Sequence, residues 1–383
     1  MASPEQHALL SASGSHRWLA CPPSIRLTEA FESKSSVFAD EGRVAHAYSE
    51  YILGKFIGKV SGGIPSEILE SQYFGDEMKS YVAEYTDHVK EEFNAALAVD
   101  KNAQLLLENQ YCYDDYVPEG FGTADVTILT ERKLIVMDLK YGKGVPVDAE
   151  NNPQIRLYGL GAYQSFGMLY DFEEVELHIL QPRLESYTSE CLLLEELLDW
   201  GESIKPIARM AYDGGGEFSS GEHCRWCPIK ATCRHRYEEN IALAQNDFCD
   251  PKILSFKEIG TILGQVKRLE AWAKDVQTYA FEQAKKGVDI PGWKLVPGRS
   301  SRFIPDDKQE EFKSELRMMF KESELTKTNF KSMSEIEKML GKKDFSSLFD
   351  DIIKISEGKP TLVPEDDKRP AMSGVQAAVD DFL

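Results

Sequence analysis

The sequence has no long hydrophobic run and little basic charge. No stretch approaches the roughly 18 uninterrupted apolar residues of a membrane-spanning helix. The opening MASPEQHALL lacks basic and hydrophobic segments, so we expect no secretory signal, no membrane association and a cytoplasmic location. The 383 residues include 44 Lys and Arg against 64 Asp and Glu, a net charge of −20. This balance argues against a protein that coats nucleic acid non-specifically, but a metal ion and a local basic groove could still meet phosphates.

Hydrophobic periodicity predicts an α/β fold. Apolar residues recur at helical spacing in several long segments, and short β-rich runs separated by turn residues lie between them. The predicted helices cover about residues 11–20, 40–53, 75–100, 153–170, 191–212 and 255–286, with shorter ones near 308–321 and 334–340. The predicted strands are 105–113, 124–129, 133–140 and 174–181. The order of helix, three strands, helix and strand predicts a mixed central sheet flanked by helices.

Three of the seven cysteines, Cys224, Cys227 and Cys233, lie within ten residues. Thiolates at these gaps can converge on one soft metal centre, which needs a fourth ligand to be closed. The candidates are Cys21, Cys249, His223 and His235. With a histidine the site suits zinc, whereas with four cysteines both zinc and a [4Fe–4S] cluster are chemically reasonable.

Cys21 is the preferred fourth ligand, because the two prolines after it restrict the backbone. Its participation would join an N-terminal helix to the distal cysteines and close a loop of about 200 residues. Cys112, Cys191 and Cys249 have apolar or strand-like neighbours, so we expect them to be core residues.

Basic side chains surround the clustered cysteines and could supply local phosphate contacts. They are Arg225, Lys230, Arg234, His235 and Arg236. Trp226 and Tyr237 lie among them. Both suit stacking on single-stranded bases, but we expect core packing as their main role.

Two aspartates occur on neighbouring predicted strands. Asp138 and Lys140 are two residues apart on an extended segment, so they share one face. If that strand pairs with the strand that carries Asp125, two carboxylates and an ammonium converge. Such carboxylates hold a hard divalent cation, usually magnesium, and the Leu139 carbonyl is an additional candidate ligand. The cation would activate a water, which Lys140 would orient or deprotonate.

Two flanking helices carry further candidates. Upstream, Gly42 and His46 lie on a predicted helix. Downstream, Gln154 and Tyr158 share a helix face at i,i+4 spacing. With Arg156 nearby, this pair suits a scissile phosphate or a metal-bound water.

Taken in order, these residues resemble the RecB-like branch of the PD-(D/E)XK nuclease superfamily. That branch has a G-x-x-x-H helix, a G-x-x-D strand, a D/E-x-K strand and a Q-x-x-x-Y helix. The matching residues are Gly42 and His46, Gly122 and Asp125, Asp138 and Lys140, and Gln154 and Tyr158. One early cysteine and a later C-x-x-C-x-x-x-x-x-C are similar to the iron–sulfur nucleases, namely the AddB nuclease domain and the CRISPR-adaptation exonucleases. The whole-chain pattern also resembles a phage-encoded family of uncharacterised proteins in this superfamily.

The resemblance implies a restriction-endonuclease-like core and a role for each matching residue. It makes His46, Asp125 and Asp138 ligands of Mg²⁺ or Mn²⁺, Lys140 the catalytic lysine, and Gln154 and Tyr158 positioning residues. The implied ligands of a structural [4Fe–4S] cluster are Cys21, Cys224, Cys227 and Cys233. Glu108 lies where such nucleases often carry an acid on the first core strand, and we rank it below the others. The phosphate loop of a helicase is absent from the sequence.

On this basis the chain divides into five predicted parts. They are a helical part, 1–100, with Cys21 and His46; the nuclease core, 101–190; a helix and iron–sulfur segment, 191–240; a long helix and basic segment, 241–300; and a C-terminal extension, 301–383. The extension contains a predicted linker at 356–372, which has three prolines, and an acidic tail.

The favoured prediction is a metal-dependent exonuclease that acts on DNA ends in phage recombination, with the choice between single- and double-stranded ends left open. A catalytically silent DNA-end or protein-binding scaffold of the same fold is the alternative, as is zinc in place of iron and sulfur. The tail, 378–383, resembles the acidic-aromatic tips of bacterial single-stranded DNA-binding proteins. It therefore suggests recruitment of a single-strand annealing or single-strand-binding protein.

Overall fold

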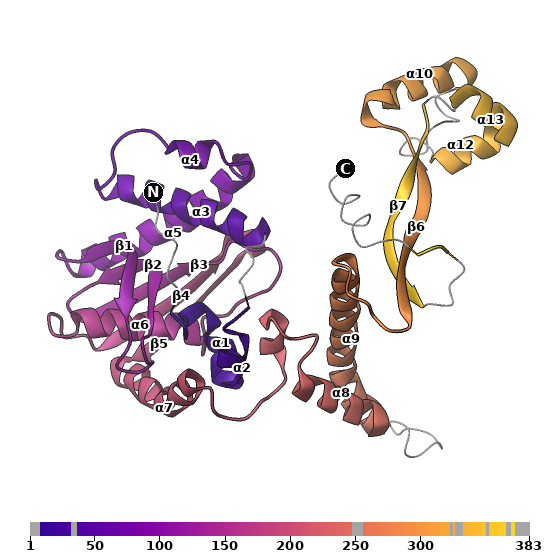
Figure 1. Ribbon diagram of the computed structural model, residues 1–383. Coiled ribbons are helices and arrows are strands. Elements are labelled where there is room, and N and C mark those ends of the chain that lie inside the picture. The colour runs from indigo at the N-terminus through magenta and orange to yellow at the C-terminus, as the bar shows by residue number, and fades with distance from the viewer. Residues whose placement is uncertain are drawn as a thin grey trace. The chain divides into compact units, whose positions relative to one another are not determined.

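In the computed structural model the chain forms two compact units, Met1–Ile253 and Leu254–Leu383 (Figure 1). The structure describes residues 8–31, 37–246, 256–321, 325, 332–349, 352–364 and 369–371. None of the helices in these ranges carries an apolar stretch long enough to cross a membrane.

The first unit contains a five-stranded mixed sheet with the strand order β1-β2-β3-β4-β5. The strands are β1 (Gln104–Cys112), β2 (Phe121–Leu129), β3 (Lys133–Leu139), β4 (Glu174–Gln181) and β5 (Ser186–Leu193). β1, β2 and β3 form an antiparallel meander, β4 is parallel to β3, and β5 is antiparallel to β4. The parallel pair needs a crossover, which α6 (Pro153–Phe166) provides. The predicted mixed α/β fold is confirmed.

Helices cover both faces of this sheet. α3 (Val37–Phe56) and α5 (Asp76–Val99) pack on one face, whereas α6 and α7 (Leu194–Asp213) pack on the other. Because successive strand residues point to opposite faces, Val136 of β3 joins the α6–α7 core and Met137 joins the α3–α5 core.

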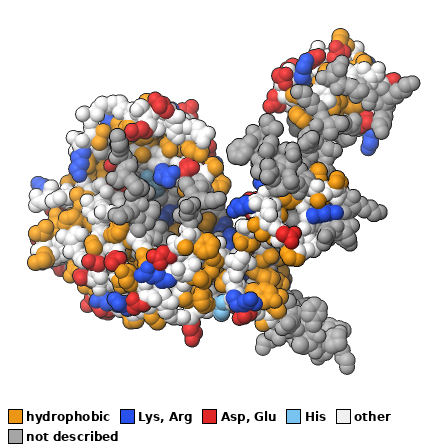
Figure 2. All heavy atoms as spheres, viewed as in Figure 1, with side chains coloured by type: hydrophobic (Ala, Val, Ile, Leu, Met, Phe, Trp, Pro, Cys, Tyr) orange, Lys and Arg blue, Asp and Glu red, His pale blue; other side chains and the backbone are white. Residues whose placement is uncertain are grey.

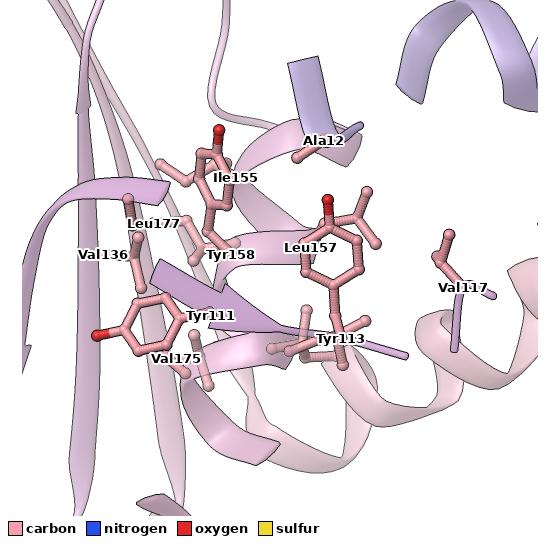
Figure 3. Packing of buried hydrophobic residues seen from close by; sticks show 14 of the residues in the cluster. Ala12, Tyr111, Tyr113, Val117, Val136, Ile155, Leu157, Tyr158, Val175 and Leu177 are labelled. Atoms are coloured by element: carbon pink, nitrogen blue, oxygen red, sulfur yellow. The ribbon is translucent and has the colours of Figure 1, made fainter. Parts of the chain in front are cut away.

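The core beneath α6 positions one of the predicted site residues. Figure 3 shows Leu157 and Tyr158 of α6 among Val136, Val175 and Leu177 of the sheet. Tyr158 is therefore held by apolar packing on the side of α6 that faces the sheet.

Short elements complete the first unit. They are η1 (Ala12–Gly14), α1 (Ser15–Ala20), α2 (Ser24–Thr28), α4 (Ser66–Leu69), η2 (Pro182–Leu184), η3 (Glu222–Trp226) and α8 (Arg234–Asn246). α1 contacts α6, α7 and η3, and its Trp18 is fully buried. The N-terminal segment thus packs against both the cysteine segment and the helix that carries Gln154.

One strand of the first unit was not predicted. β5 occupies residues 186–193, so the helix predicted from residue 191 begins only at Leu194. β5 pairs on one side only, with β4, and most of its side chains are exposed or half-buried. Such an edge strand lacks the apolar alternation of a strand that lies on a core.

The second unit contains a long helix, a two-stranded ribbon and a small helical core. Its elements are α9 (Phe256–Lys285), β6 (Trp293–Phe303), η4 (Asp306–Lys308), α10 (Gln309–Met319), α12 (Met333–Leu340), α13 (Lys342–Phe349) and β7 (Lys354–Pro364). The buried residues of the helical core include Phe312, Leu316, Phe345 and Phe349. The predicted long helix at 255–286 is confirmed by α9.

The linker predicted at 356–372 is wrong over residues 356–364, which belong to β7. β7 pairs antiparallel with β6, and a register shift places Lys359 and Pro360 opposite Pro297. A bulge tolerates prolines because the ladder there needs no amide donor. The pairing partner is distant in the sequence, so local composition favoured a linker. The predicted acidic tail, 378–383, lies outside the described residues.

Candidate metal centre and cysteine pocket

The candidate metal centre lies where the pairing of β2 and β3 ends. The last pair of the ladder on this side is Val126 with Met137. One residue beyond it, the buried Asp125 carboxylate accepts a hydrogen bond from the Leu139 amide, with an Oδ2–N distance of 2.6 Å. A side-chain contact therefore continues the link between the strands and fixes the orientation of Asp125.

His46, Glu108 and Asp125 form the first group of the centre. His46 Nδ1 lies 3.1 Å from Asp125 Oδ1, and one potential ligand atom from each of the three residues lies within 4.8 Å of the others. α3, β1 and β2 each contribute one of these residues. One imidazole and two carboxylates form a donor set that suits Mg²⁺ or Mn²⁺.

Glu108 is a stronger candidate than its sequence context indicated. Its φ of 46° lies in the left-handed region, which a non-glycine residue seldom adopts. The β1–β2 ladder pairs the residues on either side of Glu108 and Asp125 but not these two with each other. Backbone strain of this kind concentrates at functional sites. In the sequence, the only sign of a role for Glu108 was its place as an acid on the first core strand. Its backbone conformation is visible only in the structure.

The charges of this group influence one another strongly. Burial disfavours charge on His46, but Asp125, together with the charges of Asp138 and Glu108, outweighs this effect and raises the pKa of the imidazole to about 9. Burial and the neighbouring Asp125 raise the pKa of Glu108 to about 8. The raised pKa values of His46 and Glu108 both reflect several acids packed close together. A divalent cation would compensate their negative charge.

Asp138, Lys140, Gln154 and Tyr158 form the second group. Lys140 Nζ lies 2.9 Å from Asp138 Oδ2 and donates a hydrogen bond to Gln154 Oε1 at 2.8 Å. The amide nitrogen of Gln154 donates to Asp138 Oδ1 at 3.2 Å and to the Tyr158 hydroxyl at 3.3 Å. Burial raises the pKa of Asp138, and the Lys140 ammonium opposes this effect. Gln154 therefore holds the lysine and the aspartate in one network.

The two groups adjoin each other at the end of β3. Leu139, whose amide binds Asp125, stands between Asp138 and Lys140 in the chain. The charge of Asp125 also contributes to the raised pKa of Asp138. The structure thus brings all the matched side chains to one region, but Glu108, and not Asp138, completes the compact group of three potential ligands. The roles of Asp138 and the Leu139 carbonyl as ligands stay predictions.

Tyr85 of α5 is a member of the site that the sequence analysis missed. Its side chain is fully buried, and its hydroxyl has no hydrogen-bond partner among the described residues. Burial raises its pKa, and the nearby charges of Asp125 and Asp138 raise it further. An orphaned buried hydroxyl beside carboxylates fits a site that accommodates a further ligand or water. In the sequence, Tyr85 is one of the regularly spaced apolar residues of the helix predicted at 75–100, a pattern that gives no sign of a role in a site.

A close contact explains the glycine of the G-x-x-D motif. A Cβ atom on Gly122 would lie 2.9 Å from a ring carbon of Tyr158, nearer than such atoms normally approach. Any larger residue at this position would displace Tyr158 and, through it, Gln154. No close contact of this kind explains the glycine at position 42, since no atom lies within 4 Å of the place where its Cβ would stand.

Arg156 does not take the role near a phosphate that its sequence position suggested. Its guanidinium donates to the buried Glu190 carboxylate, with an Nε–Oε2 distance of 2.8 Å, and lies over the Trp200 ring. Because it is two residues from Gln154 on the helix, its side chain leaves α6 in a different direction. Arg156 connects α6 to β5 and α7.

The four predicted cluster cysteines line one small pocket, as do His223 and Arg17. The cysteines are Cys21, Cys224, Cys227 and Cys233. The structure thus brings Cys21 to the distal cysteines, while Cys249 lies outside the described residues. Four thiols around one pocket form a donor set that fits zinc or a [4Fe–4S] cluster.

His223 contacts this pocket without replacing a cysteine. Hydrogen bonds with Cys21 and Cys224 raise the pKa of His223 to about 10. Burial opposes ionisation of the Cys21 thiol, but its contacts with His223, Ser219 and Ser24 together outweigh this effect and lower the pKa of Cys21. The pKa of Cys224 is lowered as well, whereas burial raises the pKa of Cys227. The surroundings of Cys21 and Cys224 therefore favour thiolates, the form that binds metal.

Two expectations about core residues were wrong. Cys112 and Cys191 are exposed, since each points away from the sheet's cores. Trp226 is 74% exposed, with the Arg225 guanidinium 5.4 Å from the centre of its ring. Tyr237 is also exposed, and Arg234 lies over its ring. Trp226 ends the short η3 and Tyr237 lies on α8, and in both places the ring is on the surface of the unit.

Glu108→Gln is expected to weaken Mn²⁺ binding by about tenfold or more, because it removes one charged ligand. Titration calorimetry of the purified protein measures this affinity. The same substitution relieves repulsion among the acids, so the melting temperature without metal should not fall. Glu91→Gln, at an exposed position of α5, is the matched control. Unchanged Mn²⁺ affinity in Glu108→Gln would exclude Glu108 from the ligand set.

The fold and these side chains define a mixed α/β protein with a candidate divalent-metal centre and a cysteine pocket. The chain belongs to the family described as "Protein of unknown function (DUF2800)", whose model matches residues 7–370. It is also similar to a solved structure titled "Crystal structure of SSO0001", with 15% sequence identity and a TM-score of 0.26. That match covers 61% of this chain and 89% of the other. A TM-score at this level does not establish a shared fold.

Proposed function

We propose that this protein is a divalent-metal-dependent DNA exonuclease of the PD-(D/E)XK type, acting in phage DNA recombination. One observation carries the proposal. The four motif pairs of the sequence lie on two helices and two strands, with Lys140 directly after β3, and their polar side chains gather at the end of β3. A meander of three strands followed by a helix and a parallel strand is the arrangement expected of a restriction-endonuclease-like core.

The side chains divide the chemistry between them. His46, Glu108 and Asp125 would hold Mg²⁺ or Mn²⁺, with Asp138 as a further ligand. The bound ion would lower the pKa of a water and polarise a phosphoryl oxygen. Lys140, held 2.8 Å from Gln154 Oε1, would orient the attacking water or stabilise charge on the phosphate. Tyr158 supports this arrangement through its contact with Gln154.

The surface near the cysteine pocket supports a nucleic-acid substrate. Trp226 and Tyr237 are exposed, and each has an arginine over its ring. Exposed rings stack on unpaired bases and the arginines would contact phosphates. Figure 2 shows acidic and basic side chains interspersed on the visible face of the first unit. These features favour local contacts with a DNA end.

The cysteine pocket would hold a structural [4Fe–4S] cluster, with zinc as the alternative. Its four cysteines come from the N-terminal segment and from the segment after α7. A cluster here would join two parts of the unit about 200 residues apart in the chain. The tail, 378–383, remains the proposed contact for a single-strand annealing or single-strand-binding protein.

Cleavage of end-labelled linear DNA tests the proposed activity. We expect wild-type protein to shorten the DNA with Mg²⁺ or Mn²⁺ and to be inactive with EDTA. Asp138→Asn should be inactive under both conditions, since the neutral amide neither binds the ion well nor balances Lys140. Equal, negligible cleavage by both proteins, when the wild type is folded and metal-loaded, would leave only a catalytically silent scaffold.

A further inference from the structure

A pocket of about 530 Å³ lies beside α3 in the first unit. α3, α4 and the segment around them supply its walls, which are mainly apolar and aromatic. The wall residues are Val44, Tyr51, Val60, Pro65, Ile68 and Tyr73. The Tyr51 hydroxyl donates a hydrogen bond to the Gly62 carbonyl at 3.1 Å, so the ring is held in place. A volume of this size suits a flat organic ligand.

The pocket adjoins the candidate metal centre through Glu50. Glu50 lines the pocket and lies one helical turn after His46, so both side chains leave the same face of α3. Glu50 therefore lies between the pocket and the group formed by His46, Glu108 and Asp125.

The charge of the pocket indicates which part of a DNA strand could enter it. The acids Asp40, Glu50 and Glu67 line it together with Arg43, and Arg43 is paired with Asp40. This excess of carboxylates repels a phosphate. Carboxylates accept hydrogen bonds from the exocyclic amino groups of adenine, cytosine and guanine, while aromatic walls suit the faces of any base.

We infer that this pocket binds an unpaired nucleobase at the end of the DNA strand whose phosphate reaches the metal centre. The inference rests on the proposed function and adds a preference for an end with at least one unpaired base. The base would occupy the space lined by Tyr51 and Tyr73, and its neighbouring phosphate would reach an ion held at His46 and Asp125. The pocket thus selects strand ends, because an internal base pair cannot present a free base face.

Fluorescence anisotropy of labelled single-stranded oligonucleotides tests this inference. Ca²⁺ replaces Mg²⁺, and a gel checks that the oligonucleotide stays intact. One oligonucleotide has normal ends and the other has abasic terminal nucleotides. Wild-type protein should bind the normal end about tenfold more tightly, the size expected from one stacked base. Ala47→Trp, from an exposed helix position that lines the pocket, should remove this difference by filling the space.

Ala95→Trp, at an exposed position of α5, is the matched control and should keep the difference. Equal binding of the two oligonucleotides by wild-type protein, or an unchanged difference in Ala47→Trp, would overturn the pocket inference. Cleavage of linear DNA under Mg²⁺ is measured in parallel. If the protein cleaves DNA but binds both oligonucleotides equally, the proposed activity stands and the pocket inference fails. If it prefers the normal end but does not cleave, the pocket binds a base and the proposed activity fails.

Discussion

Lys140→Met is expected to reduce DNA cleavage by about 1,000-fold, because a positioned donor at the reacting phosphate contributes on that order. The ammonium contacts Asp138 and Gln154 but does not belong to the group of His46, Glu108 and Asp125. Mn²⁺ binding should therefore persist in the variant. Single-turnover cleavage of labelled DNA, at saturating metal, separates the loss of chemistry from a loss of ion.

Lys143→Met is a close control for this substitution. Lys143 is exposed three residues further along, where its ammonium lies near Glu77. This control should cleave at nearly the wild-type rate. Because Lys140→Met leaves Asp138 without its counter-charge, circular dichroism must show that the variant is folded with metal bound. Wild-type cleavage by a folded Lys140→Met protein would refute the assigned role of the lysine.

Cys21→Ser is expected to lower the free energy of unfolding by about 2–5 kcal/mol, because a bound centre would close a loop of about 200 residues. The native contacts around the segment support this coupling. α1, which ends directly before Cys21, contacts both η3 and α6. Guanidinium unfolding of anaerobically purified protein measures the stability, and elemental analysis measures iron and zinc in the same sample.

Cys191→Ser is the matched control, because Cys191 is exposed and does not line the cysteine pocket. It should retain both metal content and stability. A brown wild-type protein that contains iron and sulfide would support the cluster, whereas a colourless protein with stoichiometric zinc would support the alternative. Wild-type metal content and stability in Cys21→Ser would remove Cys21 from the ligand set.

The sequence predicted most elements of the first unit because their patterns are local. The apolar run of β3 and the buried residues of α5 and α6 are visible in short windows. β5 was missed because an edge strand shows little of that pattern. β7 was missed because its pairing with β6 joins residues about 60 positions apart, and its prolines mask the strand.

The sequence by itself determined the polar residues and their spacing: Asp138 and Lys140 share a strand face, and Gln154 and Tyr158 share a helix face. These relations follow from the repeat of a strand or a helix and need no long-range contact. Only the tertiary structure placed Glu108 beside His46, turned Arg156 toward Glu190 and brought Cys21 to the distal cysteines. These positions depend on how separate elements pack and where a ladder ends, which no local repeat specifies.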